Sequence, residues 1–214
     1  MPRPSHRDKI ITAGVSVFES HGYHGSSVRD IVAEAGVPMG SFTNHFRSKQ
    51  LFALLVIDRN FGRLREAFDI TLLDSTKPAI ERLDAYFDIA VARLRQEDFR
   101  SGCLLGKLAQ EMADQDNAIQ NRLSEAFKAW QGAFEVCIRD GLRNGEFESG
   151  LGASKLAEFI LSSWQGAMLR MKIDGTNRPL STFRQALFSQ ILIPAKSTQR
   201  SPYRPARKRQ TAAP

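Results

Sequence analysis

GYHGSSVRDIVAEAGVPMGSFTNHFRSK, residues Gly22–Lys49, is the stretch that decides the fold. Apolar residues recur in it at helical spacing in two short runs, residues 27–35 and 38–46. The Ala-Gly-Val turn between the runs centres on Gly36, which tolerates a positive φ at no steric cost. Two short helices joined across such a turn have the length and spacing of a helix-turn-helix, so the sequence predicts that motif here.

The second of these helices, which Val37 and Pro38 are expected to open, is the one that enters the major groove in a helix-turn-helix. Gly40 would let its backbone approach DNA closely. Phe42 and Phe46 are expected to be buried beneath it. Small polar side chains on the helix could reach base edges or phosphates, and these are Ser41, Thr43, Asn44 and His45.

Two further residues of the stretch are suited to phosphate oxygens. Ser26 or Ser27 offers a hydroxyl to cap the first short helix, and the amide end of a helix attracts anions. Lys49 begins the next helix, after Ser48, and carries a positive charge. Such contacts would position the protein on the duplex without reading its sequence.

The same stretch resembles the DNA-binding signature of the TetR family through its Gly-aromatic, Ala-Gly-Val, Gly, His-Phe and Lys pattern, and the resemblance covers about the first 60 residues. It implies a homodimer that binds double-stranded operator DNA and represses transcription. One departure is Thr43, which stands where the family usually has a tyrosine that grips a phosphate. The DNA-binding residues implied are Ser26, Ser27, Arg29, Pro38, Met39, Gly40, Ser41, Thr43, Asn44, His45 and Lys49.

The rest of the chain also follows helical periodicity, with no sustained alternation typical of strands, so the sequence predicts an all-α protein. We expect a helix-turn-helix domain at 1–48, a helical effector-binding and dimerisation domain at 49–194 and a basic disordered tail at 195–214. Expected helices cover residues 6–21, 49–72, 78–94, 102–112, 118–142, 152–173 and 179–193, besides the two short ones.

The net charge of +7 is weak evidence for DNA binding, because the segment 195–214 holds six basic residues and no acid. A sequence-indifferent architectural DNA-binding protein that acts through this tail is therefore an alternative. All four histidines lie within the first 45 residues, and the two cysteines, Cys103 and Cys137, cannot form a metal quartet. No catalytic residue, metal, cofactor or membrane span is predicted, and the expected location is the cytoplasm.

Large apolar side chains of the second domain could surround a small effector or could simply fill the core, and the sequence leaves both readings open. These residues are Phe87, Met112, Phe127, Trp130, Phe134, Trp164 and Met168. The family resemblance further implies that helices 152–173 and 179–193 pair with a second copy of the chain. The small residues Ser162, Ser163, Gly166 and Ala167 would allow that close approach.

Cys103 is a candidate sensor of electrophiles or oxidants. If Ser101 caps the following helix, Cys103 lies in its first turn with Arg100 and Lys107 nearby, a setting that lowers a thiol pKa. The segment Ser101–Leu104 resembles the cysteine-bearing box of TetR-family repressors of electrophile-detoxifying reductases, the subgroup of the N-ethylmaleimide reductase repressor. Lys172 falls where that subgroup carries a lysine. An inert, buried cysteine is the alternative.

Overall fold

The first helix of the computed structural model, which describes residues 5–194, is α1 (His6–His21), as the sequence predicts. The Ser5 hydroxyl caps it by accepting a hydrogen bond from the Asp8 amide at 3.2 Å. The inner face of α1 buries Ile10, Val17 and Phe18 against the helices that follow. α1 is therefore the base on which the helix-turn-helix is built.

The two short helices are α2 (Val28–Glu34) and α3 (Gly40–His45). Ser27 is the cap of α2, and the turn residue Gly36 has φ 62°, as a left-handed turn requires. The predicted start of α3 at Pro38 is wrong by two residues. The carbonyl of Pro38 accepts from the Ser41 amide at 2.9 Å, an i to i+3 turn bond, so regular α-helix begins only at Gly40.

The remaining helices agree with the predicted ones to within two residues at most ends. The exception is the last helix, predicted over 179–193, which is interrupted. Their bounds are α4 (Lys49–Ile70), α5 (Ala79–Gln96), α6 (Leu104–Met112), α7 (Asn117–Arg143), α8 (Ala153–Asp174) and α9 (Arg178–Ala186). A π-helical segment, Leu187–Ile191, continues α9, and two-residue strands β1 (Phe147–Glu148) and β2 (Ile193–Pro194) pair antiparallel.

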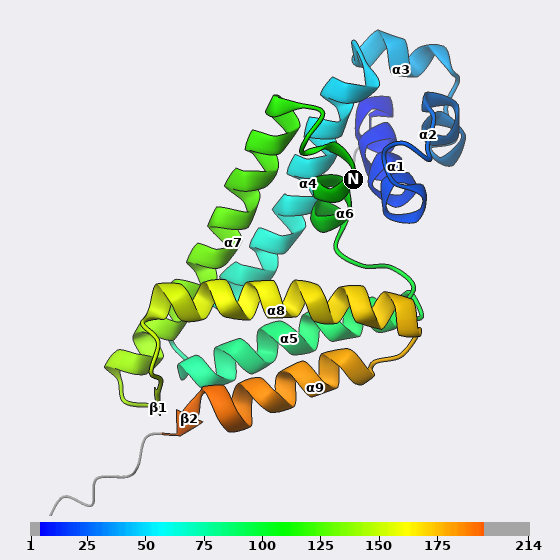
Figure 1. Ribbon diagram of the computed structural model, residues 1–214. Helices are drawn as coiled ribbons and strands as arrows, with labels where there is room; N and C mark the ends of the chain where they lie inside the picture. The colour runs from blue at the N-terminus through cyan, green and yellow to red at the C-terminus, as the bar shows by residue number, and fades with distance from the viewer. Residues whose placement is uncertain (1–4, 195–214) are drawn as a thin grey trace, which may run out of the picture.

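α4 connects the two parts of the molecule, because it packs against α1 at its beginning and against α7 further along (Figure 1). α5, α8 and α9 lie side by side across the far end of α4 and α7. α6 is short and packs against α1, α4 and α7, so it stands between the helix-turn-helix unit and the larger bundle. The segment 195–214, predicted to be a disordered tail, lies outside the described residues.

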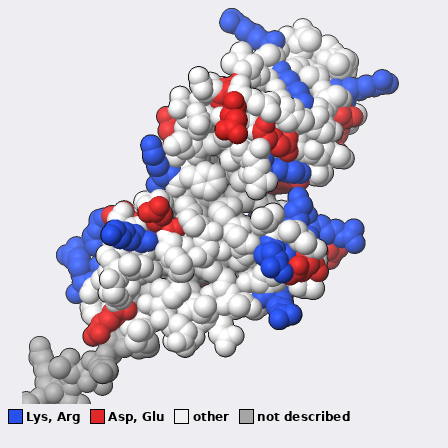
Figure 2. Space-filling view, viewed as in Figure 1, with Lys and Arg blue, Asp and Glu red and all other residues white. Residues whose placement is uncertain are grey.

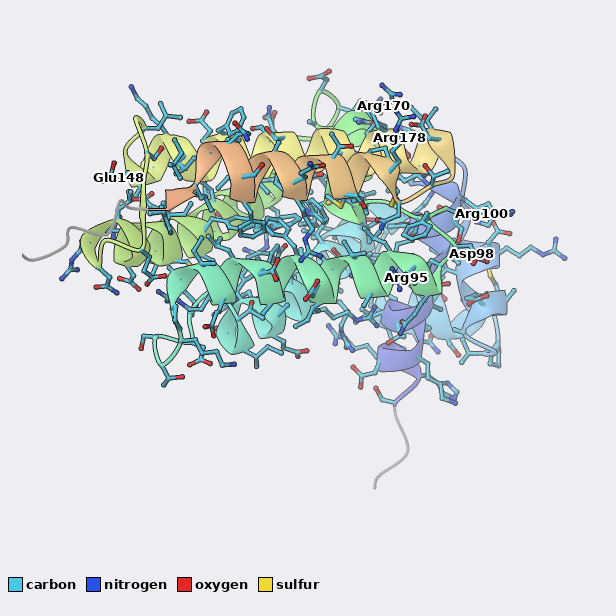
Figure 3. The ribbon with its side chains drawn as sticks, turned by 90° about the horizontal axis from the view of Figure 1, so that it is seen from below. Arg95, Asp98, Arg100, Glu148, Arg170 and Arg178 are labelled. Atoms are coloured by element: carbon cyan, nitrogen blue, oxygen red, sulfur yellow. The ribbon has the colours of Figure 1, made fainter. Side chains whose placement is uncertain are left out.

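Three helices end in the same hydrogen-bonded turn, in which one residue beyond the helix adopts positive φ. Gly36 does so after α2 and Gly145 after α7, but Asp98 does so after α5, with φ 50°. There the Asp98 amide bonds to the Arg95 carbonyl at 3.0 Å and the Phe99 amide to the Leu94 carbonyl at 2.9 Å. Figure 3 shows Arg95, Asp98 and Arg100 grouped at this end of the bundle, with Glu148 at the opposite end.

None of the helices in the described part of the chain combines the length and the apolarity that crossing a bilayer requires.

Candidate DNA-binding surface and effector cavities

α3 rests on a cluster of aromatic rings centred on Phe52 of α4. The Phe52 ring centroid lies 5.2 Å from that of Phe42, 4.9 Å from that of Phe46 and 6.1 Å from that of Phe18. Phe42 of α3 and Phe46, which directly follows this helix, are both buried, as predicted. A β-carbon at Gly14 would lie 2.4 Å from Phe52 Cζ, so α1 approaches this ring as closely as a glycine allows. The orientation of α3 is thus fixed from below by packing.

The opposite face of α3 is exposed and polar. Thr43, Asn44 and His45 are all exposed, and the Thr43 hydroxyl donates to the Gly40 carbonyl at 3.1 Å. Nothing lies within 4 Å of a β-carbon built at Gly40, so a large surface could approach the backbone there. Pro38 and Met39, which precede α3, are exposed as well. These residues form the surface that the sequence assigned to DNA.

Two of the serines assigned to DNA are turned inward, contrary to expectation. Ser41 is buried, and its hydroxyl oxygen lies 3.4 Å from Nδ1 of His6. Ser26 is also buried, and its hydroxyl donates to the Tyr23 carbonyl at 3.1 Å. Ser41 therefore lies on the side of α3 that faces His6, the first residue of α1. Sequence spacing alone did not separate it from its exposed neighbours.

The amide end of α2 is exposed and already holds a carboxylate. The Asp30 carboxylate accepts hydrogen bonds from the Ser27 amide at 2.7 Å and from the Ser27 hydroxyl at 2.6 Å. These hydrogen bonds lower the pKa of Asp30, because they favour its charged form. Arg29 lies beside this end and is exposed. A phosphate that approached α2 would meet Arg29 but would also meet the charge of Asp30.

Lys49 is half-buried and is engaged within the chain. Its ammonium donates to the carbonyls of Tyr23 and Ser26 and lies 4.3 Å from the centroid of the Tyr23 ring. Burial lowers the pKa of Lys49. The side chain therefore ties the start of α4 to the loop before α2. Contact of its ammonium with a phosphate stays a prediction.

Figure 2 shows the charges on one face of the molecule. In the upper part of this face, over the unit formed by α1, α2 and α3, basic side chains project at the top of the molecule, and acidic side chains lie among and below them.

Two cavities lie in the larger bundle. The aromatic cavity, of about 400 Å³, is walled by Tyr86, Trp130 and Trp164 and lies among α4, α5, α7 and α8. The lysine cavity, of about 460 Å³, is lined by Lys107 and Lys172 and lies between α6 and α8. Both volumes are in the range of small-molecule sites. The residues Gly102–Leu104 and Met168 line both cavities and separate them.

The structure brings together only part of the predicted effector set. Trp130, Trp164, Met168 and Cys103 line the aromatic cavity. Cys103, Met168, Lys107, Phe127 and Lys172 line the lysine cavity. Phe87, Met112 and Phe134 line neither, and each is a buried core residue. The Phe87 ring, for example, is enclosed by those of Phe134, Trp164 and Phe183, at centroid distances of 5.8, 5.0 and 5.2 Å.

Cys103 differs from the prediction in two ways. It is itself the cap of α6, because its sulfur accepts from the Gly106 amide at 3.4 Å, whereas Ser101 makes no capping bond. Burial raises the pKa of the Cys103 thiol, against the opposing effect of hydrogen bonds from Gly106 and Gln165. The predicted lowering of the pKa is therefore wrong. Lys107, expected beside the thiol, directs its ammonium elsewhere.

α6 is bonded directly to the end of α1. The Lys107 ammonium donates to the carbonyls of Glu19 and Ser20 at 2.9 and 3.1 Å, where the last carbonyls of a helix favour a cation. The Glu111 carboxylate accepts from the His24 amide at 2.9 Å. These contacts span almost ninety residues of chain and could not be inferred from local sequence patterns. They connect the wall of the lysine cavity to the helix-turn-helix unit.

The aromatic cavity contains polar groups that sequence reasoning did not identify. Asn60 of α4 is only 3% exposed and lines this cavity. The indole Nε1 of Trp130 is buried and has no hydrogen-bond partner among the described residues. Leaving a buried donor unpaired costs about 1 to 3 kcal/mol. An aromatic stripe at helical spacing carries no signal that would distinguish this indole from ordinary core.

Comparison with known proteins gives the family. Residues 10–54 match the model described as bacterial regulatory proteins, tetR family, and residues 79–187 match the tetracyclin repressor-like C-terminal domain. The chain is 36% identical over 192 residues to the HTH-type transcriptional repressor DhaR of Mycobacterium sp. (strain GP1), covering 90% of this chain and 95% of DhaR. It is 32% identical to the transcriptional regulator AcuR of Cereibacter sphaeroides, and the match covers 81% of this chain and 80% of AcuR.

Solved structures agree. Regulatory protein TetR from Rhodobacter sphaeroides superposes with a TM-score of 0.80 at 29% identity, covering 85% of this chain and 96% of that one. The reduced form of E. coli NemR superposes with a TM-score of 0.78 at 22% identity, covering 90% of this chain and 100% of NemR. At this identity the likeness supports the fold alone. The named relatives are a transcriptional repressor and a transcriptional regulator. Because both halves of the chain match these models, the chain belongs to the TetR family of DNA-binding transcriptional regulators.

Proposed function

We propose that the chain acts as a homodimeric repressor that leaves its operator when a small effector enters the bundle. The observation that carries this proposal is the exposed polar face of α3, held rigidly on the Phe52 cluster. Groove-reading surfaces need polar atoms at fixed positions, since base edges are distinguished by hydrogen-bond geometry. A polar face that served only solubility would not need such support.

Base contacts are assigned to Thr43, Asn44 and His45, which are the exposed polar side chains of α3. Asn44 can form two hydrogen bonds to an adenine edge. Thr43 and Arg29 suit phosphates, as a neutral donor and as a cation. Ser41 is left out of this set, because its hydroxyl lies within the unit. Ser27 keeps a role only through the amide end of α2, since its side chain is bonded to Asp30.

Dimerisation is assigned to an exposed stripe along α8, formed by Phe159, Ser162, Gly166, Leu169 and Ile173. These positions are spaced by three and four residues, so they share one helix face. The three large members are between 45 and 69% exposed in the single chain. A second copy packed on this stripe would bury their apolar surface and bring a second α3 to the neighbouring half-site.

Effector response is assigned to the two cavities, because their walls are bonded to the DNA-binding unit through α6. A ligand that displaces α6 displaces the end of α1, and with it the position of α3 in the dimer. The altered spacing of the two recognition helices lowers the affinity for an operator whose half-sites are fixed by the pitch of DNA.

Selection of duplexes from a random library by the purified chain tests the proposal. We expect one enriched, two-fold related sequence. Asn44→Ala should weaken binding to it by about fivefold to a hundredfold, as loss of a paired base contact does, whereas Asn121→Ala, an exposed asparagine on α7, should have no effect. Absence of any enriched sequence would contradict the proposal and would favour an architectural DNA-binding protein instead.

Covalent sensing at Cys103 is a second candidate, favoured by the place of this residue in the walls of both cavities. An electrophile that entered either cavity would meet the sulfur. Titration of operator binding with N-ethylmaleimide should then release the wild-type protein but not Cys103→Ser. Equal release of both proteins would contradict covalent sensing at Cys103 but would not contradict the proposed repressor function.

A further inference from the structure

The aromatic cavity is apolar over most of its wall but carries hydrogen-bond donors at one place. Trp130 is 2% exposed, and its indole N–H has no partner of acceptable geometry among the described residues. Tyr86 is likewise 2% exposed. Burial raises the pKa of its hydroxyl, and the nearby Trp130 N–H opposes this effect, so the two polar groups are neighbours. Both residues line the cavity. Two buried donors therefore lie beside the same empty space.

These donors are held firmly by the surrounding rings. The Tyr86 ring packs edge-on against that of Phe134 at a centroid distance of 5.1 Å, and the Trp130 ring stacks on that of Phe127 at 6.0 Å. Neither aromatic side chain can turn its polar atom toward solvent without breaking this packing. Apart from the neighbouring Tyr86 hydroxyl oxygen, a molecule inside the cavity is the source of an acceptor for these donors.

The charged groups of the lining indicate which kind of acceptor fits. They are Arg63, Arg93 and Glu97, an excess of one positive charge. The guanidinium of Arg93 is paired with the Glu19 carboxylate at 2.6 Å, and Arg63 is exposed at the rim. Leu64, Leu94 and Met168 contribute apolar parts of the wall. The carboxylates of Glu19 and Glu97 both pair with Arg93, so an ammonium group would find no free carboxylate here, whereas an oxygen acceptor on an apolar body would fit both the donors and the apolar wall.

We infer that the aromatic cavity binds a small, largely apolar molecule through a carbonyl or carboxylate oxygen, which accepts hydrogen bonds from Trp130 Nε1 and the Tyr86 hydroxyl. This inference rests on the proposed effector role of the cavity and specifies the chemistry of the effector. Asn60, which lines the same cavity and is 3% exposed, can add a donor or an acceptor and so contribute to selectivity.

Three probes of similar shape test the inference: acetophenone, with a neutral carbonyl, benzoate, with a carboxylate, and ethylbenzene, with no oxygen. The chain has two tryptophans, so a nitrogen-15 spectrum shows two indole N–H signals, which Trp130→Phe and Trp164→Phe assign. We expect at least one oxygen-bearing probe to bind about fivefold to tenfold more tightly than ethylbenzene, in keeping with one hydrogen bond, and to move the Trp130 signal downfield. Whether benzoate or acetophenone binds better assigns the acceptor as charged or neutral.

The two tryptophan variants form a matched pair. Trp164→Phe removes the same bulk from another wall of the cavity, so it should weaken all three probes alike and keep the preference for oxygen. Trp130→Phe should abolish that preference. The inference is overturned by a Trp130 signal that stays in place at saturation, by equal binding of all three probes, by binding of none, or by a preference that survives Trp130→Phe. The wild-type spectrum decides if Trp130→Phe does not fold.

The outcome is independent of DNA, because binding is measured without an operator. If the oxygen-bearing probe engages Trp130 but leaves operator affinity unchanged, the inferred hydrogen bond to an oxygen acceptor is supported, whereas the proposed effector role of this cavity is contradicted. If the chain selects no operator while the probe still engages Trp130, the proposed repressor function fails by itself.

Discussion

Asp98 occupies a backbone position that glycine usually fills. It follows the last residues of α5 with φ 50°, in the turn that Gly36 and Gly145 form elsewhere in the chain. A side chain in this left-handed region is strained, because its β-carbon crowds the backbone, although Asp and Asn tolerate it better than most residues. The next residue, Phe99, also has a positive φ, 57°.

Asp98→Gly should therefore stabilise the chain, by about 1 kcal/mol, because relief of the strain exceeds the entropy lost by glycine. The Tm in thermal unfolding followed by circular dichroism should rise by a few degrees. Gly145→Ala introduces the same strain after α7 and should lower the Tm. A lower Tm for Asp98→Gly would show that the carboxylate of Asp98 contributes more than its backbone costs.

The thiol of Cys103 should react slowly at neutral pH. Burial raises its pKa, so less thiolate is present than in an ordinary cysteine, and the thiolate is the nucleophile. The alkylation rate of a free thiol, with a pKa of about 8.5, stops rising with pH once the thiol is fully ionised. At that pH the rate of alkylation of Cys103 by iodoacetamide should still be increasing. Cys137, whose pKa burial raises to about 12, should remain unmodified and serves as an internal control. A plateau below that pH would contradict this assignment.

At the scale of elements, sequence periodicity predicted the all-α fold and α1, α7 and α8 to within a residue or so. It placed α3 two residues early, because proline suits both a first helical turn and the turn before it. It placed the end of α5 two residues early, at Leu94 instead of Gln96, since the left-handed residue beyond that helix is aspartate rather than glycine. The pairing of β1 with β2 depends on contact between distant segments, which local patterns do not encode.

The residues of the DNA-binding surface and of the cavities were likewise predicted only in part. Exposed residues of α3 followed from the motif, but the inward direction of Ser41 depends on the angle at which α3 meets α1. Trp130 and Phe87 carry the same sequence signal, and only the packing shows that one lines a cavity and the other does not. The hydrogen bonds from α6 to α1 join segments almost ninety residues apart.

The stripe on α8 gives a prediction at this scale. Phe159→Glu places a charge on the proposed dimer face without disturbing the core, because Phe159 is 45% exposed. We expect the protein to sediment as a monomer and to lose operator affinity at least tenfold, as one half-site is lost. Ile70→Glu makes the same change at a residue of α4 that is 64% exposed, off the stripe, and should leave the dimer intact. An unchanged sedimentation coefficient for Phe159→Glu would exclude this face.

At the scale of the whole molecule, the link between α6 and α1 determines how firmly the two parts are held together. Lys107→Met keeps the apolar stem but removes the bonds to the carbonyls of Glu19 and Ser20. Amide exchange in residues 18–26, measured by mass spectrometry, should become about tenfold faster, since a charged hydrogen bond contributes roughly 1.5 kcal/mol. Lys128→Met, at an exposed lysine of α7, is the control. Unaltered exchange would mean that Lys107 does not hold α1.

α4 carries Phe52 beneath the recognition helix and, about two turns later, Asn60 in the wall of the aromatic cavity. We expect this single stiff helix to tilt as one body, so that a displacement at Asn60 is transmitted to Phe52. A tilt of a few degrees over its 22 residues, roughly 33 Å, moves one end by more than an ångström relative to the other. Chains with identical cavities but a different curvature of this helix should therefore differ in the ligand concentration at which induction begins.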